Sequence, residues 1–177
     1  MKKVLLTHAY YLQLDPKQWA TGNPYAPLAT LYAAAVLKKQ GYTVSFFDTM
    51  FAASAEEITP AFNQVNPDIL FICDDGFNYL TKMCLTNMRE ETFEMIAMAK
   101  QRNCIVICSS SDATDHFEEY LDKGADFIII GEAEGTLINL MNAINHETTD
   151  LLQVDGIAFK KSGSVIKTRK AAVIKEL

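Results

Sequence analysis

The stretch from Cys104 to Thr136, CIVICSSSDATDHFEEYLDKGADFIIIGEAEGT, gives the strongest indication of the fold. It contains two short apolar runs, Ile105–Cys108 and Phe127–Ile130, and each run is followed by a polar loop of small residues. A helical pattern that ends at Lys123-Gly124 separates the two runs. Short apolar runs bounded by turn residues are typical of strands that are buried on both faces of a parallel sheet. The stretch therefore predicts two consecutive βα units.

The rest of the chain extends this pattern in both directions. Further strands are expected at Lys3–Thr7, Thr43–Phe47 and Ile69–Cys73, and helical patterns separate them. Right-handed crossovers between such units give a doubly wound α/β fold of the Rossmann or flavodoxin-like type. We expect a five-stranded parallel sheet in the order 2-1-3-4-5.

Two local patterns add detail to this fold. The helix after the first strand carries apolar residues at Leu28, Leu31, Tyr32 and Ala35, a stripe that is expected to pack on the sheet. Near the C-terminus, two strand patterns flank a Ser162-Gly163 turn and predict a β-hairpin. We therefore divide the chain into an α/β domain, residues 1–148, and a hairpin extension or linker, residues 149–177.

Charge and composition exclude several classes of protein. The 177 residues carry a formal net charge of −6 and no extended Lys/Arg cluster, which argues against nucleic-acid binding. No segment approaches the roughly 20 consecutive apolar residues of a membrane-spanning helix. The four cysteines lack the spacing of a disulfide framework. A cytoplasmic protein with reduced thiols is the expectation.

The candidate site lies where the parallel strands end. Ligands of open α/β sheets bind outside the carboxyl ends of the strands, where small residues allow close approach to the backbone. The chain provides four groups of residues at this edge: His8 after the first strand; Asp74, Asp75, Gly76 and Asn78 after the third; Ser109, Ser110, Ser111 and Asp112 after the fourth; and Gly131, Glu132 and Glu134 after the fifth.

The residues alone leave the chemistry of this edge open. Small residues also serve simply to turn a strand into a helix. Asp74-Asp75 could hold Mg²⁺, but one carboxylate of such a pair commonly caps the loop. Cys104 and Cys108 lie four apart on a strand and favour core packing over metal binding. His8 has no neighbouring nucleophile that would indicate a catalytic triad. Neither a G-x-G-x-x-G motif nor a P-loop lysine is present, which disfavours standard nicotinamide or ATP binding.

The order of landmarks along the chain resembles the N-terminal cobalamin-binding domain of cobalamin-dependent radical S-adenosylmethionine enzymes. The segments that carry the resemblance are Asn23–Leu28 with the following Gly41–Val44 and Asp48, Asn66–Leu70, the turn Gly131–Leu137, and the hairpin Val154–Phe159. Family members usually carry Gly-Gly-x-His after the fourth strand, where this chain has Ser109-Ser110-Ser111-Asp112. The D-x-H-x-x-G motif that supplies a histidine to cobalt in other cobalamin domains is absent.

The resemblance implies a cobalamin-binding module that holds the corrin at the carboxyl edge, base-off and without a histidine on cobalt. The parent enzyme would be a methyltransferase or a cyclase. Its 4Fe-4S cluster and S-adenosylmethionine would lie in a C-terminal radical barrel of the same polypeptide, because Cys104-x-x-x-Cys108 lacks the third cysteine of a cluster motif. The module itself would carry no catalytic residue and no metal ligand. The alternative is a domain that keeps the fold but serves as an interaction or scaffolding surface; a stand-alone, metal-dependent enzyme is a third possibility.

Overall fold

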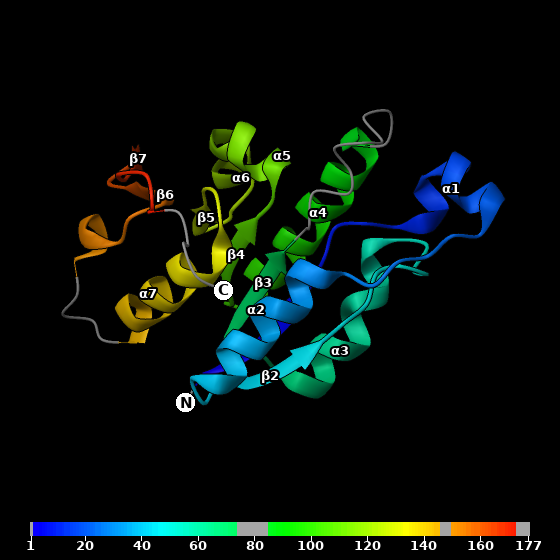
Figure 1. The fold of residues 1–177 in the computed structure, drawn as a ribbon, viewed down its shortest axis with the longest axis horizontal. Coiled ribbons are helices and arrows are strands. Elements are labelled where there is room, and N and C mark those ends of the chain that lie inside the picture. The colour runs from blue at the N-terminus through cyan, green and yellow to red at the C-terminus, as the bar shows by residue number, and fades with distance from the viewer. Residues whose placement is uncertain (1, 74–84, 146–149, 173–177) are drawn as a thin grey trace.

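The sheet is seven-stranded and mostly parallel (Figure 1). The computed structural model describes residues 2–73, 85–145 and 150–172 of the chain. The strand order is β2-β1-β3-β4-β5-β6-β7. The first five strands pair in parallel, and β6 and β7 add an antiparallel hairpin next to β5. The predicted doubly wound fold, its strand order and the C-terminal hairpin are confirmed.

The strands follow the apolar runs of the sequence. Their bounds are β1 (Lys3–Thr7), β2 (Thr43–Phe46), β3 (Ile69–Cys73), β4 (Ile105–Ser109), β5 (Phe127–Ile129), β6 (Ile157–Lys161) and β7 (Ser164–Lys167). All five side chains of β3, the middle one of the five parallel strands, are buried. Because successive residues point to opposite faces of a sheet, this continuous burial requires a layer of helices on each face.

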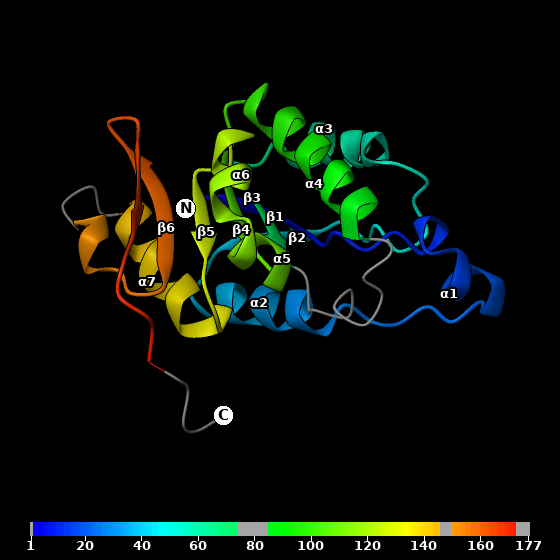
Figure 2. The same ribbon diagram turned by 90° about the horizontal axis from the view of Figure 1, so that it is seen from above.

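Two helical layers provide that cover, as Figure 2 shows from above. One face is covered by α2 (Leu28–Lys39) and α7 (Ala133–Asn145), and the opposite face by η2 (Ala55–Ile58), α3 (Thr59–Val65), α4 (Leu85–Lys100), α5 (Ser111–Asp115) and α6 (Phe117–Asp122). The short η1 (Leu12–Leu14) and α1 (Pro16–Thr21) follow β1, and η4 (Leu151–Gln153) precedes the hairpin.

The core is divided by the sheet into two apolar clusters. Neighbouring residues of β1 separate accordingly, with Leu5 in the cluster under α4 and with Val4 and Leu6 in the cluster under α2 and α7. Cys104 and Cys108 both lie in the α4-side cluster and are buried. The expectation that these two thiols pack in the core is confirmed.

The orientation of α2 differs from the prediction. The stripe of Leu28, Leu31 and Tyr32 was expected to face the sheet, but these side chains are 58%, 42% and 55% exposed. The buried residues of the helix are instead Thr30, Ala33 and Leu37. Thr30 is tolerated inside because its hydroxyl donates a hydrogen bond of 2.6 Å to the backbone oxygen of Cys73.

The helical pattern between β4 and β5 is also divided in two. It forms α5 and α6, which meet at His116. Among the described residues, no helix is long and apolar enough to cross a membrane.

Candidate functional site at the carboxyl edge of the sheet

The ends of β4 and β5 bring two of the predicted groups of residues together. The strands pair in parallel with Ser109 opposite Ile129, so the residues that follow each strand emerge side by side. Gly131 is exposed and has a φ of +91°, a conformation that favours glycine. A Cβ placed on Gly131 or Gly135 would meet no other atom within 4 Å. The backbone of this turn therefore borders open space that a ligand could occupy.

The three serines of the β4 end have different environments. Ser109 is buried, 5% exposed, as the last residue of the strand. Ser110 has an extended backbone and caps α5, because its Oγ accepts a hydrogen bond of 2.8 Å from the N–H of Ala113. Ser111 begins α5 and is exposed. Ser110 and Ser111 are thus the serines that face the edge, with Ser109 beneath them.

Asp112 is held by side chains from two other helices. Arg89 of α4 donates two hydrogen bonds to its carboxylate, from Nε to Oδ2 at 2.8 Å and from Nη2 to Oδ1 at 2.6 Å. The hydroxyl of Tyr120 donates a third, at 2.8 Å. The Arg89 and Asp112 side chains are only 19% and 11% exposed. This carboxylate therefore fixes α5 to α4 and α6 and is committed to that role.

The charge of Asp112 is stabilised by these contacts. Burial alone would raise the pKa of Asp112, but the hydrogen bonds from Arg89 and Tyr120 outweigh it and hold that pKa below its usual value. The hydrogen bond to Asp112 in turn raises the pKa of the Arg89 guanidinium. Burial, and then the charge of Asp112, raises the pKa of Tyr120. The pair is therefore ionised at neutral pH.

His8 lies in the interior beneath the end of β1 rather than at the surface of the edge. The residue is 1% exposed, and its ring stacks on Phe46 with 6.2 Å between the ring centres. Nε2 lies 2.8 Å from Oδ1 of Asp48, and Nδ1 accepts a hydrogen bond of 3.3 Å from the N–H of Tyr10. The hydrogen bond between His8 and the Asp48 carboxylate lowers the pKa of Asp48. Both ring nitrogens thus contact protein groups.

The remaining predicted residues divide between the β3 and β5 ends. Glu132 is exposed beside Gly131, and Glu134 lies in the first turn of α7. A cavity of about 210 Å³ adjoins this turn and is lined in part by Glu132, Gly135 and Asp155. Asp74, Asp75, Gly76 and Asn78 lie outside the described residues. Within the described ranges, no group of three His, Cys, Asp or Glu residues could hold a metal ion.

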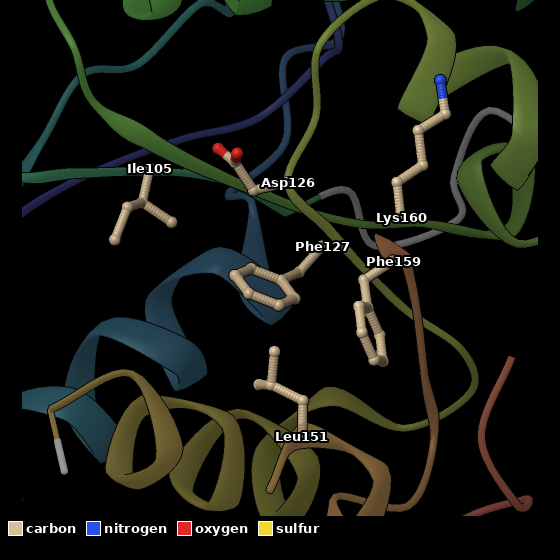
Figure 3. A pocket seen from close by; sticks show the side chains of 6 residues that line it. All are labelled: Ile105, Asp126, Phe127, Leu151, Phe159 and Lys160. Carbon is tan, nitrogen blue, oxygen red and sulfur yellow. The ribbon is translucent and has the colours of Figure 1, made fainter. Parts of the chain in front are cut away.

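A second cavity, of about 300 Å³, lies at the opposite edge of the sheet (Figure 3). Phe127, Phe159 and Leu151 face one another across it. Both charged groups at its rim are already paired: Asp126 accepts from Lys100 at 2.7 Å, and Lys160 donates to Asp122 at 2.6 Å. The carboxyl edge, with its open backbone, is the better candidate for a ligand.

Sequence reasoning missed Arg89 and Tyr120. Arg89 lies one turn inside α4, 23 residues before Asp112, and nothing in its local pattern indicates this partner. A weak signal was available for Tyr120, which follows Asp112 by eight residues on the same side of a helical pattern.

Comparison with known proteins gives similarity in sequence and in structure. No protein family model matches the chain. Over 176 residues it is 29% identical to the anaerobic magnesium-protoporphyrin IX monomethyl ester cyclase of Synechocystis sp., a match that covers 94% of this chain and 34% of the cyclase. The chain thus spans about a third of the length of that relative.

Two solved structures match nearly the whole chain. One is the cobalamin-dependent S-adenosylmethionine radical enzyme OxsB with aqua-cobalamin and S-adenosylmethionine bound, with a TM-score of 0.72, 18% identity, and coverage of 98% of this chain and 23% of that enzyme. The other is the radical S-adenosylmethionine methyltransferase TsrM of Kitasatospora setae with cobalamin and a 4Fe-4S cluster bound, with a TM-score of 0.72, 16% identity, and coverage of 99% and 30%. The chain therefore has the fold of the matched part of these cobalamin-dependent radical enzymes, as the resemblance predicted.

Proposed function

We propose that the chain is the cobalamin-binding module of a radical S-adenosylmethionine enzyme, of the methyltransferase or cyclase type. The observation that carries the proposal is the match of nearly the whole chain to the two cobalamin-dependent enzymes, together with the sequence similarity to the cyclase. The corrin would lie against the carboxyl edge, over the turns that follow β4 and β5.

The residues at this edge fit a large, flat cofactor. Ser110, Ser111, Gly131 and Gly135 have small side chains, and the space above the two glycines is open. The rim of a corrin carries amide groups, which need hydrogen-bond partners from the protein. Ser110 Oγ already accepts from Ala113, so its hydroxyl proton is the group that it can offer to a ligand. The exposed Gly131 turn provides backbone groups at the same edge.

His8 and Asp112 would support this site without touching the corrin. The ring of His8 is enclosed and contacts Asp48 and Tyr10, so it would hold the end of β1 rather than bind cobalt. Asp112 would keep α5 in place through Arg89. The described residues also include His116, whose Nε2 lies 3.8 Å from Oδ1 of Asp112. We therefore propose base-off binding without a histidine on cobalt.

Cobalamin would supply a cobalt centre for methyl or electron transfer, and this chain would supply only binding and orientation. The matched relatives are three to four times longer than the part they share with the chain, which covers 34%, 23% and 30% of their lengths. We propose that the catalytic partner is a radical S-adenosylmethionine barrel in the same polypeptide. That barrel would bind S-adenosylmethionine and the 4Fe-4S cluster.

A titration of the purified chain with hydroxocobalamin, followed by absorbance, tests the proposal. We expect a saturable change to a base-off spectrum with one cobalamin per chain. If a titration to ~0.1 mM cofactor, equivalent to about −5.5 kcal/mol, produces no change with the chain or with the longer polypeptide that carries it, the proposal is wrong. That result would favour the alternative, an interaction surface built on the same fold.

A further inference from the structure

The outer face of α2 is apolar, although it faces away from the sheet. Leu28, Leu31 and Tyr32 are 58%, 42% and 55% exposed, and Ala35 is exposed as well. These positions, i, i+3, i+4 and i+7, lie along one side of the helix. We call them the α2 stripe. Figure 2 shows α2 in the helical layer on one face of the sheet, below the strands in that view.

The composition of α2 indicates that its outer face is covered in the functional protein. The helix reads LATLYAAAVLKK, so it has no charged residue before Lys38. Helices on the surface of a soluble domain carry charged or polar residues on the outer face, and a helix that is apolar all round is buried. Thr30, Ala33 and Leu37 already fill the inner face. The α2 stripe is therefore not needed for packing among the residues that the structure describes.

The stripe begins at the carboxyl edge of the sheet. Thr30, in the first turn of α2, donates a hydrogen bond to the backbone oxygen of Cys73, which is the last residue of β3. The first turn of α2 thus lies at the carboxyl edge. From Leu28 to Ala35 the stripe extends about 10 Å away from that edge along the helix, at 1.5 Å per residue.

The stripe is too small to form a stable interface by itself, so we expect it to be one part of a larger interface. A stable interface between two proteins buries about 800 Å² on each partner, which is more than three large side chains and an alanine provide. A pair of α2 helices from two copies would therefore form a small contact. A partner that also covers the carboxyl edge would bury the stripe as part of a continuous surface.

We infer that the α2 stripe docks the S-adenosylmethionine-binding barrel of the parent enzyme. This inference rests on the proposed function, because the barrel must then approach the carboxyl edge where the corrin would lie. The relatives contain enough additional chain for such a barrel, and OxsB binds cobalamin and S-adenosylmethionine in one structure. A barrel seated over the edge borders the first two turns of α2, which is where Leu28, Leu31 and Tyr32 lie.

Photoactivated carbene footprinting with mass spectrometry tests the inference. The complete polypeptide that carries these residues and the 177-residue chain alone are labelled side by side. Docking should reduce the exposed fraction of the stripe from about one half to about one tenth. We therefore expect roughly fivefold less labelling of Leu28 and Tyr32 in the complete polypeptide. The exposed Asn63 and Gln64 of α3, on the opposite face of the sheet, are the internal reference and should label equally in both samples.

Two matched variants of the complete polypeptide sharpen the test. Leu31→Glu places one charge in the stripe and should restore the labelling of Leu28 and Tyr32. Gln64→Glu adds the same charge on the opposite face and should leave the protection intact. Equal labelling of the stripe in the complete polypeptide and in the chain alone overturns the inference. The inference is also overturned if the stripe is protected in the chain alone and sedimentation gives the mass of a dimer. A second copy of the chain would then cover the stripe.

Cobalamin titration of the same samples separates this inference from the proposed function. If the complete polypeptide binds cobalamin while the stripe stays exposed, only the docking surface is wrong. If it does not bind cobalamin, the proposed function fails, and the assignment of the partner fails with it.

Discussion

Replacing Arg89 by methionine should destabilise the protein by about 3 kcal/mol. Arg89 makes two short hydrogen bonds to Asp112, and both side chains are mostly buried. Removing one partner of a buried ion pair typically costs 3–5 kcal/mol, because the other charge remains without compensation. Tyr120 still donates to Asp112 in the variant, which favours the lower end of that range. Urea unfolding followed by circular dichroism measures the change.

The expected shift in the urea midpoint is about 1.5 M, for an m-value of about 2 kcal/mol per M. Arg169→Met is the matched control. Arg169 donates to Asp155 at 3.1 Å but is 77% exposed, and exposed ion pairs contribute at most about 1 kcal/mol. If Arg89→Met changes the free energy of unfolding by less than about 0.5 kcal/mol, no more than an ordinary surface substitution, then the argument that Asp112 is held by Arg89 is wrong.

The pH dependence gives an independent test of the same pair. The pKa of Asp112 is lower in the folded protein than in the unfolded chain, where it is about 3.9. Its ionisation therefore contributes stability above about pH 4, and that contribution is lost as the pH falls through the folded-state pKa. The difference between the wild type and Arg89→Met should shrink below about pH 4. A difference that stays constant down to acid unfolding would contradict the assignment.

Three further features of the fold are tested by urea unfolding of single variants. Gly156→Ala should lower the free energy of unfolding by about 2 kcal/mol more than Gly163→Ala. Both glycines have a φ of +81°, but only at Gly156 would the new Cβ lie 2.8 Å from the Cβ of Ala171. Ser110→Ala should cost about 1 kcal/mol through loss of the cap of α5. His8→Phe should cost about 1–3 kcal/mol through unmade buried hydrogen bonds. It should also leave the absorbance of bound cobalamin unchanged, since we place no histidine on cobalt.

The strands and their order could be predicted because burial on both faces leaves a simple signature. Runs such as Ile69–Cys73 are short, apolar and bounded by turn residues, and chain connectivity with right-handed crossovers then restricts the order. The hairpin was predictable because a Ser162-Gly163 pair between two short strand patterns is typical of a tight turn. In the structure both residues have positive φ, as such a turn requires.

The orientation of α2 could not be predicted from its pattern. The helix has apolar residues on both sides, so periodicity identifies a helix but not the face that meets the sheet. Leu28, Leu31 and Tyr32 form the more hydrophobic stripe, yet Thr30 lies inside because its hydroxyl finds a backbone oxygen at the end of β3. The error is informative, since local hydrophobicity that the fold does not use indicates an external contact.

The candidate site was located by topology, but the roles of its side chains were not predictable. The sequence places small and polar residues after β4 and β5, and the structure confirms that these turns are neighbours. The roles of the side chains depend on partners that are far away in the sequence. Arg89 of α4 binds Asp112, and Asp48, 40 residues after His8, binds the imidazole, so both predicted contact residues are committed to protein partners.

The decisive measurement is the dissociation constant of hydroxocobalamin, by calorimetry, for the complete polypeptide as wild type and as two tryptophan variants. Ser111→Trp places a large ring at the exposed start of α5, at the carboxyl edge, whereas Gln64→Trp places the same ring near the end of α3, away from that edge. We predict that the wild type and Gln64→Trp bind equally and that Ser111→Trp binds at least about tenfold more weakly, or 1.4 kcal/mol, with unchanged thermal stability. Equal binding by all three, or binding by none, would contradict a cobalamin site at this edge of the sheet.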